Sequence, residues 1–425
     1  MKNTRIMGSG ITLSILTSTL LYATNGDNLI AVGAKSRGMG GTGIAISHGA
    51  ESTLVNPALI TKVETTEISF GGTIFMPDMS ASMGQAPYYD SDADINVIPE
   101  VSIAHKLNEN WFVGIGMWGT AGMGVDYRNA HRDSMDSGNM GMVTNLQLMQ
   151  FGVPVAYKNS GFSVALTPLL QYGALDINYN DFSGNSNGTG IAQDLNFGYS
   201  IGATYDFDIE ELNGLTVGFV YKSKIDMDYS NQLSIATKPF VDFGIFPQAM
   251  QDNLEQPAEV GIGIAYVMSQ HTFAFDYRQV QWSEAKGYKD FGWTDQDVYA
   301  FGYEYMQDNW ALRLGYNYAE QPIGEAPSGP QVIAPGGYAM AGGNALNLFN
   351  LLGFPATSED HYTVGGTYNV TDSFAIDLAY VYAPKTTTTM NTIVGVNPMN
   401  GEMYTGPSTV EHTESSFSFQ LTYSF

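Results

Sequence analysis

The sequence predicts an all-β protein: a 14-stranded antiparallel transmembrane β-barrel with a small N-terminal hatch, mostly helical or irregular, that plugs the lumen. Three observations predict this fold. Apolar and polar residues alternate with period two, which places successive side chains on opposite faces of a strand. The apolar positions are large and aromatic, whereas the opposite positions are small or polar, as in a barrel surrounded by lipid. Only 14% of residues are charged, well below the quarter or so typical of soluble domains.

Composition excludes several classes of protein. The chain has 425 residues, with 42 Asp or Glu against 17 Lys or Arg, and its net charge is −25. This charge repels phosphates and argues against a nucleic-acid partner. A hydrophobic content of 44% argues against disorder. The absence of cysteine excludes disulfides, thiol catalysis and cysteine-ligated metals.

Residues 1–23 are interpreted as a signal peptide. Lys2 and Arg5 give a positive start, and residues 11–23 (ITLSILTSTLLYA) form a short apolar stretch. A spanning helix needs about 20 apolar residues, so we expect cleavage near Ala23 or Thr24; the alternative is a short buried helix. Downstream, every apolar run is interrupted within a few residues. Any membrane crossing is therefore expected in strands.

Fourteen segments carry the alternating pattern, and an even number is typical of single-chain bacterial barrels. In the last segment, large apolar residues ending at Phe425 alternate with Ser, Gln and Thr. A soluble β-sandwich also alternates, but its polar face normally carries many Lys and Glu residues. The expected strands are 66–79, 94–106, 110–122, 145–157, 161–178, 194–206, 214–228, 257–268, 271–282, 295–306, 310–321, 359–369, 372–384 and 412–425.

Connection lengths alternate between short turns and long loops, as expected for periplasmic turns and outer loops. Residues 24–65 precede the first strand and are too many for a simple lead-in. We therefore interpret residues 24–65 as the hatch and residues 66–425 as the barrel, whose lumen is wide enough to need filling. The long loops are 123–144, 230–256, 322–358 and 385–411.

Several short motifs resemble a known family. They are residues 26–29 (GDNL), 38–45 (GMGGTGIA), 56–60 (NPALI), 359–365 (EDHYTVG) and the terminal Phe425. Together they resemble the FadL family of outer-membrane transporters for long-chain fatty acids and other hydrophobic compounds. The resemblance covers essentially the whole mature chain. The Asn-Pro-Ala element with the preceding glycine-rich run is its most specific part, whereas most outer-membrane barrels end in an aromatic residue.

The resemblance implies a transport route. In the family, outer loops collect a greasy substrate, a pocket beside the hatch receives it, and a gap in the wall at a kinked third strand releases it sideways. Isolated glycines in a strand often mark a bend, although they could also merely end the strand. The expected kink residues are Gly119, Gly122 and Gly124, and the expected hatch and gating residues are Gly38, Gly40, Gly41, Gly43, Asn56, Pro57 and Ala58.

Two outer loops carry apolar residues that a solvated loop should lack, which indicates either binding or packing of the loops on each other. In loop 230–256 they recur at helical spacing, as one face of a short helix, and we hypothesise that this loop forms a capture groove. By alternation, Lys222 and Arg313 face the lumen, where they either bind a carboxylate or pair with acidic neighbours such as Glu304. The candidate loop residues are Phe243, Phe246, Met250, Leu254, Leu346 and Phe349.

No motif predicts an enzyme. Gly38-x-Gly40-x-x-Gly43 fits a dinucleotide fingerprint, but the alternating helices and parallel strands of that fold are missing downstream. Ser200 lies in a Gly-Tyr-Ser-Ile-Gly run, but in the middle of a strand instead of at a strand-to-helix turn. The six His residues include no i, i+4 pair. We therefore expect no cofactor and no metal.

The expected location is the bacterial outer membrane, as a multi-pass barrel, and the resemblance implies passive uptake of fatty acids or of aromatic or aliphatic hydrocarbons. The expected partners are this substrate, outer-membrane lipid and lipopolysaccharide, and the barrel-assembly machinery, through the strand ending at Phe425. Two alternatives remain open. One is a water-filled porin with residues 24–65 as a lid; the other is a structural or adhesive surface protein that uses loops 322–358 and 385–411.

Overall fold

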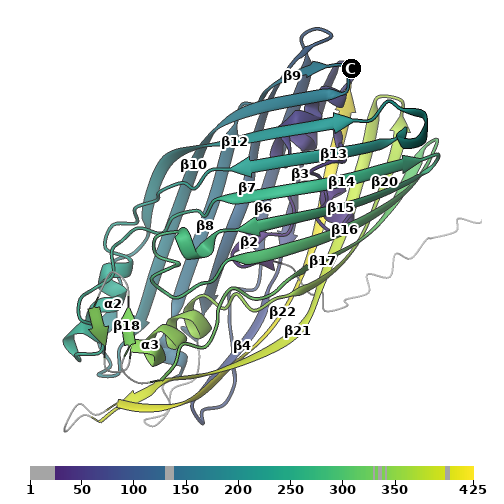
Figure 1. The fold of residues 1–425 in the computed structure, drawn as a ribbon. Helices are drawn as coiled ribbons and strands as arrows, with labels where there is room; N and C mark the ends of the chain where they lie inside the picture. The colour runs from purple at the N-terminus through teal and green to yellow at the C-terminus, as the bar shows by residue number, and fades with distance from the viewer. Residues whose placement is uncertain (1–23, 130–137, 329–330, 334–336, 340–341, 398–402) are drawn as a thin grey trace, which may run out of the picture.

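The structure, a computed structural model, describes residues 24–129, 138–328, 331–333, 337–339, 342–397 and 403–425. The expected signal peptide lies outside the described residues. The wall is a tilted cylinder of strands (Figure 1). Its strands are β3 (Thr66–Phe75) continued by β4 (Asp78–Met83), β6 (Asn96–Lys106), β7 (Trp111–Asp126), β8 (Val143–Gly152) continued by β9 (Val155–Asn159), β10 (Phe162–Asn180), β12 (Ala192–Asp206), β13 (Leu215–Lys222), β14 (Glu259–Met268), β15 (His271–Val280), β16 (Gln296–Gln307), β17 (Trp310–Ala319), β20 (Asp360–Thr371), β21 (Phe374–Val396) and β22 (Met403–Ser424).

The wall closes on itself. Each strand pairs antiparallel with the next along the chain, and the last strand, β22, pairs with the first, β3, for example at Phe419 opposite Gly72. The described residues thus form fourteen wall strands when β4 and β9 are counted as continuations of β3 and β8. The predicted fourteen-stranded antiparallel barrel is confirmed. Closure removes free sheet edges, which would otherwise drive aggregation of strands this rich in aromatic residues.

The loop predicted at 385–411 is β-strand for most of its length. The range 385–411 was expected to be irregular, but β21 continues to Val396 and β22 begins at Met403, so the two strands form a long hairpin. Its first part contains the run 386–389, four threonines, and Thr388 pairs with Val410. Threonine is β-branched and favours extended backbone, and this preference prevails over the polarity of the segment.

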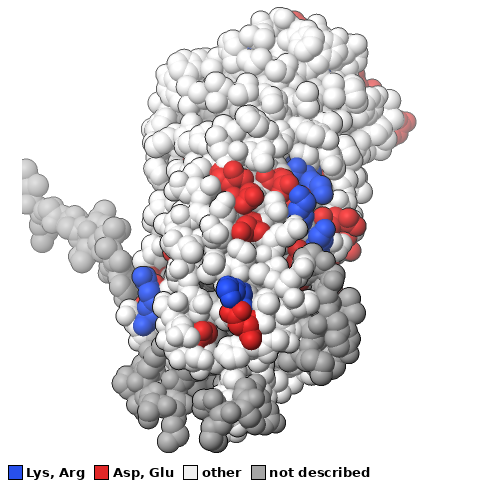
Figure 2. Space-filling model, turned by 90° about the vertical axis from the view of Figure 1, so that its left-hand side faces the viewer, with Lys and Arg blue, Asp and Glu red and all other residues white. Residues whose placement is uncertain are grey.

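The outer face of the wall is apolar. Phe197 and Ile262 are exposed, whereas their inward neighbours are small or polar. Figure 2 shows one side of the molecule whose upper part carries almost no charge, with Lys, Arg, Asp and Glu gathered in a band below it. Such an uncharged belt is what lipid requires of a barrel surface. None of the described helices is long and apolar enough to cross a membrane.

The hatch lies inside the cylinder and is almost entirely buried. Asn56 begins its last helical turn, because its side chain accepts a hydrogen bond from the Ala58 amide and Pro57 occupies the first helical position. The hatch elements are β1 (Thr24–Asn25), β2 (Asn28–Leu29), the helix α1 (Ala34–Gly38) and the 3₁₀ turns η1 (Gly49–Leu54) and η2 (Pro57–Lys62).

Buried carboxylates of the barrel hold the hatch in place. Glu100 on β6 forms a 2.6 Å ion pair with Arg37 and accepts a hydrogen bond from the Gly33 amide. On the opposite wall, Asp276 on β15 accepts hydrogen bonds from two hatch amides, those of residues 43 and 44, at 2.7 and 2.9 Å. Charged partners make these hydrogen bonds strong in a buried site. The hatch is therefore fixed by polar contacts as well as by packing.

The outer loops form a cap at the end of the barrel away from the C-terminus (Figure 1). The helix predicted in loop 230–256 exists, but it is α2 (Leu233–Asp242), upstream of the predicted apolar face at 243–254. Gly244 (φ 71°) ends it in a Schellman motif, with Ile245 N–H donating to Phe240 C=O at 2.7 Å. The remaining elements are β5 (Tyr89–Asp90), η3 (Gly138–Gly141), β11 (Ser186–Asn187), η4 (Glu210–Leu212), η5 (Trp282–Glu284), β18 (Gln331–Ile333), β19 (Gly337–Ala339), α3 (Gly342–Leu348) and the π turn η6 (Phe349–Gly353).

The Glu100 anchor gives a first prediction. Glu100→Gln leaves the Arg37 guanidinium buried without its carboxylate, and breaking a buried pair in this way costs about 3–5 kcal/mol. We expect the hatch to loosen and the barrel to conduct ions in a planar bilayer, whereas we expect the parent protein to be nearly silent. The matched control is Glu109→Gln, in the exposed turn after β6, whose carboxylate pairs with Lys106. Equal conductance in the two variants would contradict the anchoring role.

Candidate functional site

The wall opens between β6 and β7. These strands pair from Lys106 opposite Phe112 to Glu100 opposite Trp118. Beyond that point, in the described strand pairs, residues 96–99 of β6 pair with β3 and the continuation of β7 pairs with β8, so the two strands separate. Pro99 lies on the open side of the last β6–β7 pair and has no amide hydrogen to donate to a neighbouring strand.

A bulge directs β7 away from β6. The register with β8 shifts between Gly119 and Ala121, which leaves one extra residue on β7 and bends the strand. A Cβ on Gly119 would lie 2.5 Å from the Ile98 side chain, and one on Gly124 would lie 2.1 Å from the Thr144 carbonyl oxygen. Only glycine allows these approaches. The glycines expected at a kink in the third strand therefore lie along the opening, Gly122 included.

The start of the hatch occupies the free edge of β7. The Gly122 amide donates to the Asp27 carbonyl oxygen at 3.0 Å, and Asn28 pairs with Ala121. At the outer end of the opening, the Asp92 amide donates to the carbonyl oxygen of Asp126, the last residue of β7, at 2.9 Å. The backbone that β6 leaves unpaired thus finds partners within the chain, as a barrel wall in lipid requires.

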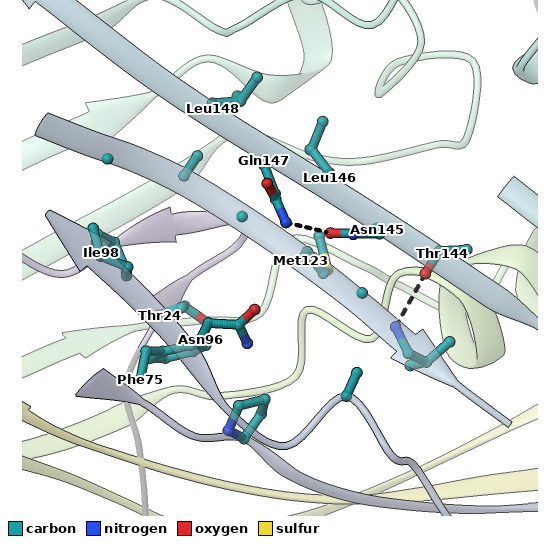
Figure 3. Close-up of a pocket in the computed structure, with 18 of the residues that line it drawn as sticks. Thr24, Phe75, Asn96, Ile98, Met123, Thr144, Asn145, Leu146, Gln147 and Leu148 are labelled. Atoms are coloured by element: carbon teal, nitrogen blue, oxygen red, sulfur yellow. Dashed lines mark hydrogen bonds between the residues drawn. The ribbon is translucent and has the colours of Figure 1, made fainter. Parts of the chain in front are cut away.

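A cavity of about 540 Å³ runs from the lumen beside the hatch to this opening (Figure 3). That volume lies within the range of pockets that hold small ligands. Figure 3 shows β7 and β8 along one side, with Leu146, Leu148 and Met123 around the space and Thr24 and Asn96 across from them. Most of the lining comes from Thr24–Leu29 of the hatch, 95–99 before and on β6, 119–126 on β7, 143–149 on β8 and residues of β10 and β22.

The ionic groups at the cavity are already paired. Arg128 is the one Lys or Arg among the described lining residues, and its Nε donates to both Asp126 carboxylate oxygens at 2.9 and 3.0 Å. On β22, His412 Nε2 lies 3.1 Å from the Glu414 carboxylate. Asp176 also lines the cavity. The lining therefore carries more acidic than basic groups and offers an incoming anion no unpaired arginine or lysine.

The two basic residues predicted to bind substrate lie elsewhere. Lys222 pairs with Glu259 at 3.4 Å and lines a separate cavity of about 40 Å³. Arg313 pairs with Glu304 at 2.6 Å and donates to Thr367, in a cavity of about 270 Å³ beneath the hatch. The structure does not bring them to the wall opening. Both residues form ion pairs with acidic residues of the barrel. Structural pairing of this kind was the alternative to substrate binding that the sequence left open.

The predicted loop residues are gathered in one buried cluster. The Phe240 ring lies 5.6 Å from that of Phe246 and 5.2 Å from that of Phe349, so loops 230–256 and 322–358 pack on each other. Phe243 is partly buried at the margin of this cluster. The same cluster continues to residues that line the cavity, namely Met79, Ala121, Val125, Leu146 and Leu148; its predicted members are Phe246, Met250, Leu254, Leu346 and Phe349.

The predicted hatch residues lie where the hatch meets the wall. A Cβ on Gly40 (φ 69°) would lie 2.7 Å from the backbone of Tyr316 on β17, so this position requires glycine. The Asn56 side chain donates to the carbonyl oxygens of Ile44 and Phe219, which ties η2 to β13. The remaining predicted hatch residues, Gly38, Gly41, Gly43, Pro57 and Ala58, are likewise buried within the hatch.

One part of the site escaped sequence reasoning. The Asp27 carboxylate, whose carbonyl oxygen holds β7, accepts a hydrogen bond from Tyr288 in the outer loop after β15. Gly26 packs against Trp282, whose ring lies 4.7 Å from that of Tyr288. Burial raises the pKa of Asp27 to about 7, partly opposed by the hydrogen bond from Tyr288. The motif GDNL, which contains Asp27, is recognisable in the sequence, but no sequence pattern relates it to Tyr288, 261 positions later.

A closed antiparallel barrel with a plugged lumen and a side opening defines a transport protein of the outer membrane. The sequence agrees at the level of family. The family described as "Outer membrane protein transport protein (OMPP1/FadL/TodX)" has a model that matches residues 23–333, and the chain belongs to this family. The expected family and the expected outer-membrane location are confirmed.

Individual relatives are distant in sequence and similar in fold. The chain is 26% identical over 332 residues to the long-chain fatty acid transport protein of Escherichia coli O6:H1. The aligned region covers 66% of this chain and 73% of that protein. A FadL homologue of Pseudomonas aeruginosa superposes with a TM-score of 0.68 at 14% identity, over 94% of this chain and 99% of the other. The toluene transporter TodX of Pseudomonas putida superposes with a TM-score of 0.63 at 15% identity, over 93% and 99%.

The buried Asp27 predicts a pH-dependent attachment of the hatch to β7. Between about pH 4 and 7, Asp27 is protonated when the hatch is attached and ionised when it is exposed to solvent. The free energy that favours attachment therefore falls by about 1.4 kcal/mol for each pH unit in this range. We expect the hydrogen-exchange protection factor of the Gly122 amide to fall roughly tenfold for each pH unit between about pH 5 and 7. Hydrogen–deuterium exchange of the peptide spanning 119–124 measures this.

Two variants make that measurement specific. Asp27→Asn should remove the pH dependence, whereas Asp295→Asn, an exposed residue of the same outer loop as Tyr288, should keep it. The Asp27→Asn variant also separates Asp27 from Glu51, another hatch carboxyl whose pKa burial raises to about 7, because Glu51 is unchanged in it. An unchanged pH dependence in Asp27→Asn would show that another group controls the attachment.

Proposed function

We propose that this protein takes up neutral hydrophobic small molecules passively, by capture among the outer loops, transfer to the cavity beside the hatch and release sideways between β6 and β7. Family membership makes the chain an outer-membrane transport protein. The observation that carries the route is the continuity of one apolar cluster from the outer loops to the cavity at the wall opening. An apolar molecule that separates these packed side chains would stay among apolar groups along the whole path.

The sideways exit is supported by the composition of the opening. Its lip carries the exposed apolar residues Ile95 and Val97, which suit a molecule passing into lipid. A straight path through the lumen would have to displace the hatch, including the buried Arg37–Glu100 pair. Removing such a contact is expensive, whereas β6 and β7 are not paired with each other at the opening, so crossing between them breaks no β6–β7 hydrogen bond. The plugged lumen also argues against the water-filled porin.

The pairing of the charged side chains at the cavity favours a cargo without a charged head group. A fatty-acid carboxylate buried in the cavity would need a cation, because an unpaired buried charge is costly. Arg128 is already held by Asp126, and both Lys222 and Arg313 are paired away from the cavity. A neutral aromatic or aliphatic hydrocarbon needs no such partner. The relatives include both a toluene transporter and a long-chain fatty acid transport protein, so kinship alone does not decide between the two classes.

A binding comparison tests this preference. We expect purified protein in detergent to bind toluene and to bind a long-chain fatty acid at least about tenfold more weakly, which corresponds to 1.4 kcal/mol or more. Calorimetry with matched detergent blanks measures both. Tighter binding of the fatty acid would overturn the neutral-cargo assignment while leaving the route itself intact.

A reversible crosslink tests the sideways exit. A Cβ on Gly119 would lie 3.7 Å from the Ile98 Cβ across the opening, which is the Cβ separation of a disulfide. The chain contains no cysteine, so Ile98→Cys with Gly119→Cys gives a unique pair. We expect oxidation to abolish most uptake of a hydrophobic substrate by cells and dithiothreitol to restore it. The controls are the reduced double variant and Ile98→Cys alone, because Gly119→Cys alone would bring a Cβ to 2.5 Å from the Ile98 side chain. Full uptake through the oxidised pair would exclude this exit.

The capture step predicts a further phenotype. Phe243→Ser together with Phe246→Ser removes two aromatic rings from the loop cluster and should weaken uptake several-fold, while the wall strands, which do not depend on them, stay folded. The control, Gln248→Ala, changes an exposed residue of the same loop. Uptake at low external substrate is the measurement, with heat-modifiable gel mobility as the folding check. Unchanged uptake would reject capture at this loop.

A further inference from the structure

A buried polar group surrounds the first described residue, Thr24. Thr24 is 5% exposed, and its hydroxyl donates to Glu414 Oε1 on β22 at 2.8 Å. Glu414 is 2% exposed, and His412 on the same strand contacts it. The start of the hatch is thus tied to the last strand of the barrel, deep inside the lumen.

The basic side chains that face the Glu414 carboxylate in this group are histidines. Among the described residues, no Lys or Arg lies within ion-pair distance of Glu414, and its basic neighbours are two buried histidines, His412 at 3.1 Å and His361 on β20. The second carboxylate oxygen, Oε2, is buried and has no hydrogen-bond partner among the described residues; neither do the side-chain amide atoms of the adjacent Asn25. Buried carboxylates are normally paired with a cation and fully hydrogen-bonded, so this oxygen indicates a cationic donor nearby.

The backbone nitrogen of Thr24 is placed to be that cation. In one threonine, the backbone nitrogen and Oγ1 are three bonds apart and therefore lie within about 4 Å of each other in any staggered rotamer, and Oγ1 already contacts Glu414. A charge on this nitrogen would therefore lie within about 7 Å of the carboxylate, close enough for a strong interaction in a buried site. A free α-amino group has a pKa near 8 and is mostly protonated at neutral pH.

The sequence supplies the chemical event that creates such a group. The apolar stretch of the expected signal peptide ends in Ala23, a small residue of the kind that precedes a cleavage site. Hydrolysis of the peptide bond between Ala23 and Thr24 by a signal peptidase consumes one water molecule and yields a carboxylate on Ala23 and an ammonium on Thr24.

We propose that cleavage occurs between Ala23 and Thr24, and that Glu414 is a docking site for the α-ammonium group that the cleavage creates. The ion pair completes the attachment of the hatch to β22. Hatch docking therefore depends on removal of the leader, and a precursor that retains it lacks this contact. The inference concerns maturation of the protein and stands whichever cargo it carries.

Two measurements on the full-length protein, purified from outer membranes, test the proposal. Intact-mass analysis should give a chain that begins at Thr24. The α-amine should then react slowly with an amine-reactive reagent at pH 7, and Glu414→Gln should raise its labelling rate at least tenfold, because loss of the carboxylate lowers the amine's pKa and frees the terminus. Mass spectrometry of the N-terminal peptide follows the rate, and only protein with folded gel mobility is compared.

Matched variants make the outcome decisive. Glu411→Gln lies on the same strand, in an exposed pair with Lys385, and should leave the labelling rate unchanged. If Glu414→Gln fails to fold, insertion of one glycine between Ala23 and Thr24 moves the ammonium away from Glu414 and should raise labelling equally. A first residue other than Thr24 would overturn the proposal. So would labelling that is the same in the parent protein and in the folded Glu414→Gln or insertion variants.

Discussion

The fold depends on one constraint: in lipid, every backbone amide and carbonyl needs a partner within the protein. Fourteen antiparallel strands meet this constraint by closing on themselves. Between β6 and β7 the pairing stops, and there the hatch takes over, with Asp27 and Asn28 contacting the backbone of β7. The wall can therefore be open at this place and still be stable, because the plug of the lumen is also a partner of the wall.

The same arrangement explains where the charges lie. Barrel carboxylates are used to hold the hatch, as in the contact of Glu100 with Arg37 and of Asp276 with the amides of residues 43 and 44. The arginine and lysine predicted to meet cargo neutralise further carboxylates instead, in the pairs Arg313–Glu304 and Lys222–Glu259. Charge thus maintains the seal and the apolar cluster remains for the proposed cargo, so the acidic composition does not conflict with the uncharged molecules that we propose.

Local patterns in the sequence predicted local structure well. Period-two alternation located the wall strands, and the glycines of β7 indicated where the structure has a bulge. Two local errors arose from competing preferences: β-branched threonines extended β21 beyond the expected loop, and Gly244 ended α2 before the predicted apolar face. Contacts between distant residues could not be predicted, because the pairing of Asp27 with Tyr288 or of Thr24 with Glu414 depends on barrel register and hatch position.

The most direct test of the account is to locate a cargo molecule in the protein. A bromine-labelled aromatic hydrocarbon soaked into crystals gives an anomalous signal at the bromine position. The account predicts a peak in the cavity bounded by β6, β7, β8 and the start of the hatch, with the hatch still in place. A peak beneath the hatch in the centre of the lumen, or a hatch displaced to form a straight channel, would contradict it.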